Sequence, residues 1–305
     1  MRLSHILPLG LAALAAAACN GHKDLCGKKF SNITMVGSHN SAFVGREPTH
    51  NQYISPTDQL NIGVRFLQAR TQSKKGHPQM CHSYCFLLDA GPIEDYLKEV
   101  GAWIDKNPNE VVTLLLNNND ELPLHKYDEA FKSSGLEKHA YRPGRRLAKE
   151  DWPTLQEFID TKRRLIVFMN TGADTNAVDY ILPQWDYYWE TPFGETDPDF
   201  PNCNIDRPEN GDPKKLMMMV NHFLNIKLPF GDIKLPDQLR APRTNSFNSI
   251  YGQAERCKAQ WGMQANVILL DWINVGKAVK TQDYMNGLGW SLFRRMTILR
   301  TWGPF

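Results

Sequence analysis

Two histidines, an arginine and an aspartate stand at or near the ends of short apolar runs, and their side chains suit phosphoryl transfer. The four are His39, Arg70, His82 and Asp271. Because histidine titrates near neutral pH, one imidazole can take a proton from an attacking hydroxyl while the other protonates the departing oxygen. A guanidinium offers fixed donors to phosphate oxygens, and a carboxylate behind one histidine fixes its tautomer. The set predicts acid–base cleavage of a phosphodiester.

The elements that position these residues follow from a repeating pattern of apolar runs and amphipathic stretches. Residues 93–106 place apolar side chains on one helical face and stop at Asn107-Pro108, and residues 155–159 also read as helical. The runs predicted as strands are residues 33–36, 64–69, 111–116, 165–169, 216–220 and 267–270. Strands apolar on both faces, alternating with helices, favour a parallel sheet covered by helices.

We therefore predict an α/β fold, a distorted parallel (β/α)8 barrel whose strand ends converge at one mouth. An open doubly wound sheet is the alternative, but the expected Gly-rich loop after the first strand is missing at residues 37–41. Residues 183–213 and 230–243 are rich in Pro, Asp and aromatics and read as long loops at the mouth.

Length and charge limit the classes of protein that fit. The 305 residues suit a single domain, predicted as residues 19–305, and a monomer. With 35 basic and 33 acidic residues, the chain lacks the one-sided charge of a nucleic-acid binder, so no nucleic acid is expected as a partner.

The first 18 residues read as a secretory signal peptide, because an apolar run follows Arg2 and ends in alanines. The run is too short for a membrane span, so we expect a secreted, extracellular protein. Cys19 as a lipoprotein acceptor is the alternative, although such signals usually carry Leu where Ala16 stands. Asn32 begins the single glycosylation sequon and marks a candidate glycoprotein.

Six cysteines in an exported chain favour disulfides over a metal site, since no CxxC pair exists. Six cysteines allow fifteen connectivities. The local pairs Cys19–Cys26 and Cys81–Cys85 are attractive, which would leave Cys203–Cys257.

Five segments, in order, resemble the X domain of phosphatidylinositol-specific phospholipases C. Residues 37–41 (Gly-Ser-His-Asn-Ser) resemble its first catalytic motif, and residues 59–70 resemble the second segment of the bacterial enzymes. Residues 80–82 resemble the strand that presents the second histidine, residues 93–116 its helix and buried strand, and residues 269–272 its late strand with Asp. The resemblance covers about residues 28 to 280 and looks closest to the secreted fungal branch.

The resemblance implies a role for each residue. His39 would be the general base, His82 the general acid, Arg70 the phosphate clamp and Asp271 the residue that orients His39. Attack by a neighbouring hydroxyl would give a cyclic phosphodiester and diacylglycerol. The animal enzymes hold calcium with acidic residues on the second strand, where this chain has Gln68 and Arg70. A guanidinium there repels calcium, so we expect no metal and no cofactor.

The headgroup contacts depart from the family pattern. Asn40 replaces an Asp after the first histidine, and it can still hydrogen-bond Arg70. The family's headgroup positions fall near Asn118, Asn170 and His222, which are the candidate substrate-binding residues here. A phospholipid or a glycosylated phosphodiester is therefore the expected substrate, with the headgroup undetermined and transient contact with a membrane surface allowed.

Other interpretations remain for several of these residues. A non-catalytic binding protein that kept the pocket is one alternative. A metal-dependent glycerophosphodiesterase is disfavoured, because His-Arg-Gly and Glu-x-Asp are absent. Asp271 could cap a following helix, and His222 could be a core histidine. The aromatic residues 185–189 favour packing over membrane contact.

Overall fold

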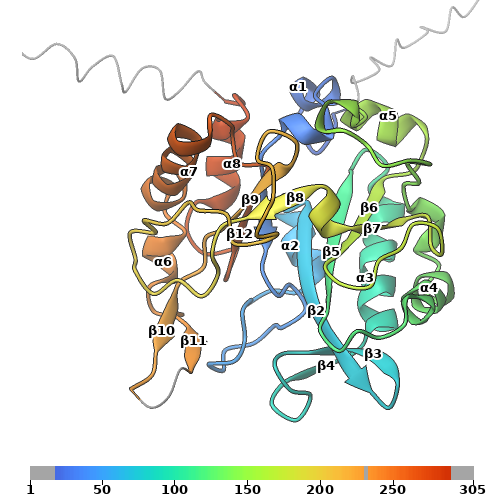
Figure 1. The fold of residues 1–305 in the computed structure, drawn as a ribbon, viewed down its shortest axis with the longest axis horizontal. Coiled ribbons are helices and arrows are strands. Elements are labelled where there is room, and N and C mark those ends of the chain that lie inside the picture. The colour runs from blue at the N-terminus through green and yellow to red at the C-terminus, as the bar shows by residue number, and fades with distance from the viewer. Residues whose placement is uncertain (1–17, 230–232, 290–305) are drawn as a thin grey trace, which may run out of the picture.

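The centre of the molecule is one curled sheet of eight parallel strands (Figure 1). The computed structural model describes residues 18–229 and 233–289. The strands, in chain order, are β1 (Met35–Ser38), β2 (Phe66–Lys74), β5 (Val112–Asn118), β6 (Leu165–Met169), β7 (Ile181–Pro183), β8 (Tyr188–Glu190), β9 (Met217–Asn221) and β12 (Val267–Leu270). In space the order is β7, β6, β5, β2, β1, β12, β9, β8, with every neighbouring pair parallel. The predicted α/β barrel arrangement is confirmed.

The barrel is distorted where its two edges meet. β7 and β8 are the edge strands, yet only residues 184–187 separate them in the chain, so they lie close together. No ladder joins β7 to β8 within the described ranges. The two edge strands are connected instead by the 3-10 helix η4 (Gln184–Asp186), which joins the end of β7 to the start of β8.

Helices cover the outside of the sheet unevenly. The helices are α1 (Lys23–Cys26), α2 (Pro56–Asn61), α3 (Ile93–Lys106), α4 (Leu124–Ser133), α5 (Leu155–Asp160), α6 (Ala241–Thr244), α7 (Phe247–Trp261) and α8 (Ala278–Met285), with 3-10 turns η1 (Phe30–Asn32), η2 (Glu137–His139) and η3 (Lys149–Asp151). In Figure 1, α3 and α4 lie on one side of the sheet and α7 and α8 on the other. The links after β6, β7 and β8 contain no α-helix, and residues 191–216 form a long loop instead.

Alternation along the strands separates two cores. On β5, Leu114 and Leu116 pack outward in the larger apolar cluster, whereas Leu115 packs inward in a second cluster inside the barrel. On β12, Leu270 faces outward and Leu269 inward. Since side chains alternate with period two, the same parity continues past each strand end. Parity therefore decides which polar residues at the mouth face the barrel interior.

Two hairpins extend from the carboxyl end of the barrel. β3 (His77–Cys81) pairs with the far part of β2, and β4 (Asp89–Pro92) pairs with β3. Because of this pairing β2 runs on to Lys74. The sequence predicted that the strand ends at residue 69, before Arg70, but Arg70 lies within it. β10 (Asn225–Lys227) and β11 (Lys234–Pro236) form the second hairpin. Figure 1 shows both hairpins projecting at the same end of the molecule.

Three disulfides are formed, and they are Cys19–Cys26, Cys81–Cys85 and Cys203–Cys257 as expected. The predicted signal peptide, apart from Ala18, and the end of the predicted domain beyond residue 289 lie outside the described residues. Asn32 of the sequon is exposed. Within the described part of the chain, no helix has both the length and the apolar character needed to cross a bilayer.

Candidate active site

A pocket opens at the carboxyl end of the barrel, and inward-facing positions of the strands supply most of its wall. The cavity encloses about 540 Å³, which includes space open to solvent. Its lining comprises His39, Gln68, Arg70, Leu115, Asn117, Asn119, Asn170, Gln184, Glu190, Phe193, Arg207, Asn221, Phe223 and Leu269. The inward apolar residues Leu115 and Leu269 also belong to the core inside the barrel, so the pocket is the polar continuation of that core.

His39 is held in one orientation by its neighbours. Its Nδ1 lies 2.8 Å from Oδ1 of the buried Asp271, and the same oxygen accepts a hydrogen bond of 2.9 Å from the amide of Asn51. The ring of Phe223 stacks on the imidazole at 3.8 Å between centroids, with 1° between the planes. With Asp271 ionised, Nδ1 donates the hydrogen bond and Nε2 is free to accept a proton.

The carboxyl of Asp271 serves His39 and not a helix end. Burial raises its pKa, while the hydrogen bonds from His39 and Asn51 act in the opposite direction. The next helix, α8, begins only at Ala278, so the alternative of a helix cap at Asp271 is wrong. A carboxylate kept behind the ring stabilises the imidazolium that forms when His39 takes a proton.

Arg70 brings a positive charge to the same cavity without a carboxylate partner among the described residues. Its Nε is buried and makes no hydrogen bond there. Burial lowers the pKa of its guanidinium, and the nearby charge of Arg207 lowers it further. A largely desolvated cation without a counter-ion is costly, and an anion bound in the cavity would relieve that cost.

His82 stands beside these groups, on the turn that follows β3. The Cys81–Cys85 disulfide closes this turn. Burial, followed by the charges of His39 and Arg70, lowers the pKa of His82 from 6.5 to about 4, while a hydrogen bond to the backbone of Thr49 acts in the opposite direction. The two histidines and Arg70 are therefore close enough to influence one another electrostatically, and His82 is neutral at pH 7 in the free protein.

Three of the candidate substrate-binding residues do not line the cavity. The side chain of Asn118 bonds Leu122, Thr171 and Tyr127 on the outer side of β5. His222 is buried against Gln253, the Thr244 carbonyl and Ser249 behind β9, which agrees with its interpretation as a core histidine.

Asn40 has its side-chain amide buried without a hydrogen-bond partner in the described chain, so the expected bond to Arg70 is not formed. Its backbone lies in the left-handed region (φ 50°), and its N–H donates to Gln68 Oε1 at 2.6 Å. Asn170 does line the cavity, and its Oδ1 accepts from the Asn118 N–H at 2.8 Å.

The residues that do face the cavity are the sequence neighbours of those that were expected. Asn117 and Asn221 line it, one position before Asn118 and His222. A shift of one residue in a strand moves a side chain to the other face, which accounts for both errors. Counting by twos from the apolar inward residues Leu115 and Met219 would have identified both asparagines.

An ion pair on the far side of the pocket, between the partly exposed Arg207 and the buried Glu190, was missed altogether. Arg207 Nε donates to Glu190 Oε1 at 2.7 Å, and the guanidinium lies over the rings of Phe193 (4.6 Å) and Trp185 (5.3 Å). Burial raises the pKa of Glu190, and Arg207 opposes that shift. Arg207 comes from the loop 191–216, a segment with no regular pattern that could have indicated its position.

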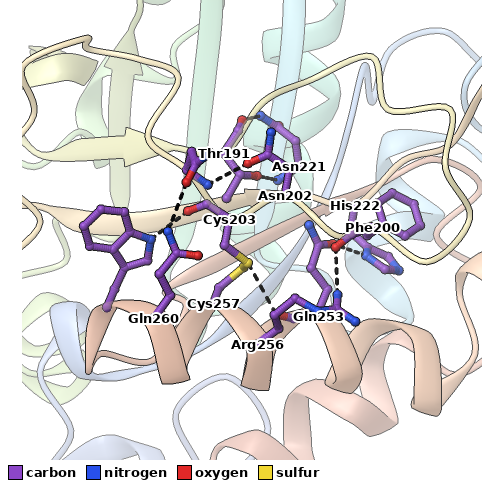
Figure 2. The surroundings of a disulfide bond; sticks show 12 residues. Thr191, Phe200, Asn202, Cys203, Asn221, His222, Gln253, Arg256, Cys257 and Gln260 are labelled. Carbon is purple, nitrogen blue, oxygen red and sulfur yellow. Dashed lines mark hydrogen bonds between the residues drawn. A yellow bond between two sulfur atoms is a disulfide. The ribbon is translucent and has the colours of Figure 1, made fainter.

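A disulfide and hydrogen bonds attach the loop 191–216 to helix α7, as Figure 2 shows. Cys203 is bonded to Cys257. The Cys203 carbonyl accepts from Trp261 Nε1 at 2.7 Å, and the Phe200 carbonyl accepts from Arg256 at 2.8 Å. Phe200 also stacks on His222 at 4.0 Å. These contacts fix the loop that carries Arg207 to the pocket.

The side chains at the cavity are poorly suited to a cation site. Its carboxylate oxygens come from Glu190, which Arg207 engages, while Asp271 behind the wall is engaged by His39 and Asn51. β2 offers an amide and a guanidinium at Gln68 and Arg70. In the residues that the structure describes, no group of three or more His, Cys, Asp or Glu side chains could hold a metal ion.

Comparison with known proteins gives consistent matches. The PI-PLC X family model matches residues 25–286. A "PI-PLC X domain-containing protein 1" of Arthroderma benhamiae is 45% identical over 94% of this chain and 98% of that protein. An "Uncharacterized secreted protein" of the same fungus is 40% identical over 85% of this chain and 60% of that protein. The phosphatidylinositol-specific phospholipase C of Listeria monocytogenes has a similar fold, with a TM-score of 0.57 at 12% identity, over 86% of this chain and 94% of that one.

Proposed function

This chain belongs to the PI-PLC X domain family, and from that premise we propose that it is a metal-independent phosphodiesterase that cleaves the headgroup from a phospholipid or a related glycolipid. The observation that carries the proposal is the guanidinium of Arg70, which has no counter-ion within residues 18–229 and 233–289, on the same cavity as the His39–Asp271 pair. A cation without a counter-ion favours a bound anion, and a base beside that anion allows its cleavage.

The reaction begins at His39. Its Nε2 takes the proton of a substrate hydroxyl next to the phosphate, and that oxygen attacks phosphorus and forms a new P–O bond. The P–O bond to diacylglycerol breaks, and the departing oxygen takes a proton from His82. The products are a cyclic phosphodiester and diacylglycerol. Arg70 stabilises the charge on the phosphate oxygens in the transition state.

The charge of the substrate prepares His82 for its role. In the free protein its pKa is about 4, so at neutral pH the ring is neutral and must gain a second proton before it can act as the acid. A phosphodiester anion placed against Arg70 and both histidines would raise that pKa, because an opposite charge favours the protonated ring. Substrate binding and acid activation are then the same event.

The remaining wall of the pocket suits a neutral headgroup with several hydroxyls. Side-chain amides from Gln68, Asn117, Asn119, Asn170, Gln184 and Asn221 surround it. Amides both donate and accept hydrogen bonds, as hydroxyls do. Phe223 adds an apolar face, and Glu190 adds an acceptor. An inositol or a sugar ring is the class of headgroup that this wall would accommodate.

We also propose that the protein is secreted and acts as a monomer in transient contact with a membrane, without a nucleic-acid partner. Three disulfides support an oxidising compartment, and one relative is named a secreted protein.

The test is release of a water-soluble phosphate ester from a panel of labelled phospholipids and glycosylphosphatidylinositols, in the presence of a chelator. His39→Ala and His82→Ala should each abolish the release, since each removes one proton-transfer group. His125→Ala, which changes an exposed histidine on α4, is the matched control and should keep full activity. Activity that requires added calcium would contradict the metal-free mechanism.

A binding protein without turnover is the second candidate. Its support is the neutral state of His82 in the free protein and an Asn40 side chain that does not reach Arg70. It would show saturable binding of a headgroup phosphate together with no product on any lipid of the panel.

A further inference from the structure

The proposed base and its carboxylate partner stand where two paired strands separate. The parallel ladder between β1 and β12 ends at Leu270, whose carbonyl also accepts from the His39 N–H at 2.9 Å. His39 and Asp271 are the next residues on the two chains. Each is followed by a residue in the left-handed region, Asn40 with φ 50° and Trp272 with φ 44°. The chains therefore turn away from the sheet directly after the two residues that have to stay in contact.

The side chain of Gln52 joins the two chains at this point. Its amide nitrogen donates to the His39 carbonyl at 2.8 Å and to the Leu270 carbonyl at 3.1 Å. Its Oε1 accepts from the Ile273 N–H at 3.0 Å. The side chain is fully buried, and buried backbone groups need hydrogen-bond partners. The amide of Gln52 therefore takes over from the backbone ladder where the ladder stops.

The neighbours of Gln52 in the chain contact the other groups of the proposed reaction. The side-chain amide of Asn51 donates to Asp271 Oδ1 at 2.9 Å. The backbone of Thr49 is hydrogen-bonded to the ring of His82. A segment of four residues thus contacts the base, the carboxylate behind the base, and the acid, which come from different strands of the sheet.

The segment is itself fixed by hydrogen bonds to residues just before it. The N–H groups of Asn51 and Gln52 both donate to the Phe43 carbonyl at 3.1 Å, and the Gly45 N–H donates to the Gln52 carbonyl at 2.8 Å. The ring of Phe43 lies 5.0 Å from the imidazole of His82, measured between centroids. The segment is therefore held in place by its own contacts, so it can set the positions of the two histidines.

We propose that Gln52 is a positioning residue, which keeps His39 aligned on Asp271 and at a fixed separation from His82. The proposal rests on the proposed function, in which His39 is the base and His82 the acid. Because Gln52 is fully buried, it acts through the backbone of His39 and does not touch the substrate. Misplacement of a reacting group by about 1 Å can cost about 10²-fold in rate. Loss of the amide should therefore slow the chemical step and leave substrate binding unchanged.

A second buried amide supplies a matched control at the opposite end of the same strands. Asn266 directly precedes β12, and its side-chain nitrogen donates to the Ser31 carbonyl at 2.6 Å and to the Ile33 carbonyl at 3.5 Å, before β1. Its Oδ1 accepts from the Met218 N–H at 3.0 Å on β9. Asn266 thus joins strands with three hydrogen bonds, as Gln52 does, but at the amino end of the barrel, away from the pocket.

The first test compares Gln52→Met with Asn266→Leu, in which apolar side chains of similar size replace the two amides. Both variants should have lower melting temperatures than the parent, because each leaves buried backbone groups without partners. At a temperature where both are folded, Gln52→Met should lower kcat about 10²-fold and change KM less than about twofold. Asn266→Leu should leave both constants within about twofold of the parent. Equal kcat values for the two variants, or a loss confined to KM, would overturn the proposal.

Gln52→Glu is the milder variant, and it carries the test if Gln52→Met does not fold. A protonated carboxyl can donate to one carbonyl and accept from the Ile273 N–H, whereas a carboxylate cannot donate. Burial raises the pKa of a carboxyl group, so part of the activity should be kept at about pH 6. The ratio of kcat in Gln52→Glu to kcat in the parent should then fall as the pH rises to about 9. No recovery relative to Gln52→Met at about pH 6, or less than half of the parent's kcat lost at about pH 9, contradicts the proposal.

A measurement without turnover separates this proposal from the proposed function. The proton on His39 Nδ1 should exchange slowly with water in proton NMR spectra of the parent, because Asp271 accepts its hydrogen bond. The signal is identified by its absence in His39→Ala. Exchange should be faster in Gln52→Met and unchanged in Asn266→Leu. Faster exchange in Gln52→Met, with no turnover by the parent on any lipid, leaves the positioning of His39 standing and removes the proposed function. Unchanged exchange in Gln52→Met, or no such signal in the parent, overturns the inference.

Discussion

The two walls of the pocket are built differently. The chemical wall consists of His39, Gln68 and Arg70, with Asp271 behind His39, and we also assign His82 beside them to it. Its lining residues stand on β2 and after β1, and Asp271 follows β12; these three strands lie side by side at the centre of the sheet. The headgroup wall (Gln184, Glu190, Arg207 and Asn221) stands at or beside the edge of the sheet, on η4, on the edge strand β8, on its neighbour β9 and on the loop 191–216. Backbone ladders on both sides hold the first wall, whereas a disulfide and side-chain contacts hold much of the second.

This difference between the two walls indicates where amino-acid substitutions are tolerated. A residue on a central strand cannot move without disturbing the register of two neighbours, so groups that must meet one phosphorus atom are best held there. A loop tied at Cys203 can change its sequence and length without disturbing the sheet. Headgroup selectivity can therefore be altered while the chemistry is kept.

The largest effect is expected at the chemical wall, from Asp271→Asn. The amide would offer a donor to His39 Nδ1 and favour the tautomer that cannot accept a proton at Nε2, so kcat should fall by about 10³-fold or more. Asn51→Ser removes only the second hydrogen bond to that carboxylate and should cost far less. A steady-state assay measures both, and an Asp271→Asn rate within tenfold of the parent would break the distinction between the walls.

Arg70→Met should lower kcat by about 10²–10³-fold without destabilising the fold, because it removes a cation that has no carboxylate partner in the part of the chain that the structure describes. Arg65, directly before the same strand, is the matched control, since its Nε bonds Glu110 at 2.8 Å and its guanidinium lies over Trp103. Arg65→Met leaves Glu110 unpaired and should cost about 3 kcal/mol of stability. Thermal unfolding gives the melting temperatures of both variants and of the parent. A lower melting temperature for Arg70→Met than for the parent would give Arg70 a structural role instead.

At the headgroup wall, Arg207→Met should raise KM about tenfold and change kcat less than twofold. The variant leaves Glu190 buried without its counter-charge, which favours the protonated acid and removes a charged acceptor from the pocket. Arg145→Met, an exposed arginine outside the pocket, controls for loss of charge. If kcat falls as steeply as KM rises, Arg207 belongs with the chemical wall and the two-wall division is wrong.

Much of the fold could be predicted from the sequence, because buried parallel strands are apolar on both faces. Residues 165–169 and 267–270 were delimited correctly, and so was α3, whose apolar side chains share one face. The open edge between β7 and β8 could not be predicted. Its strands are only three residues long, and the loop 191–216 carries no periodic signal.

The candidate site was predictable where a motif and strand parity agreed, and unpredictable elsewhere. His39 and Arg70 line the pocket and Asp271 stands behind His39, while the catalytic roles remain proposals. Asn118 and His222 are predicted because the family's headgroup positions fall near them, and that nearness does not state the direction of a side chain. Arg207 reaches Glu190 through a loop fixed by tertiary contacts, so nothing local in the sequence could place it.

The smallest expected effect is on the pH dependence of stability, through His82. It tests whether a bound anion changes the protonation of this histidine. Its folded pKa, about 4, lies below the unfolded value of 6.5, so the native state binds less proton than the unfolded state between these values. The contribution of His82 to the free energy of unfolding is therefore fully present above pH 6.5 and is lost as the pH falls toward 4. The stability difference between the parent and His82→Gln should therefore shrink over that window in urea titrations at several pH values.

Added inorganic phosphate, bound beside Arg70, should raise the pKa of His82. The native protein should then lose less stability as the pH falls toward 4. A difference that stays constant from pH 7 to 4, with and without phosphate, would mean that His82 does not sense the charges of His39 and Arg70, and it would separate the second histidine from the wall to which we assign it.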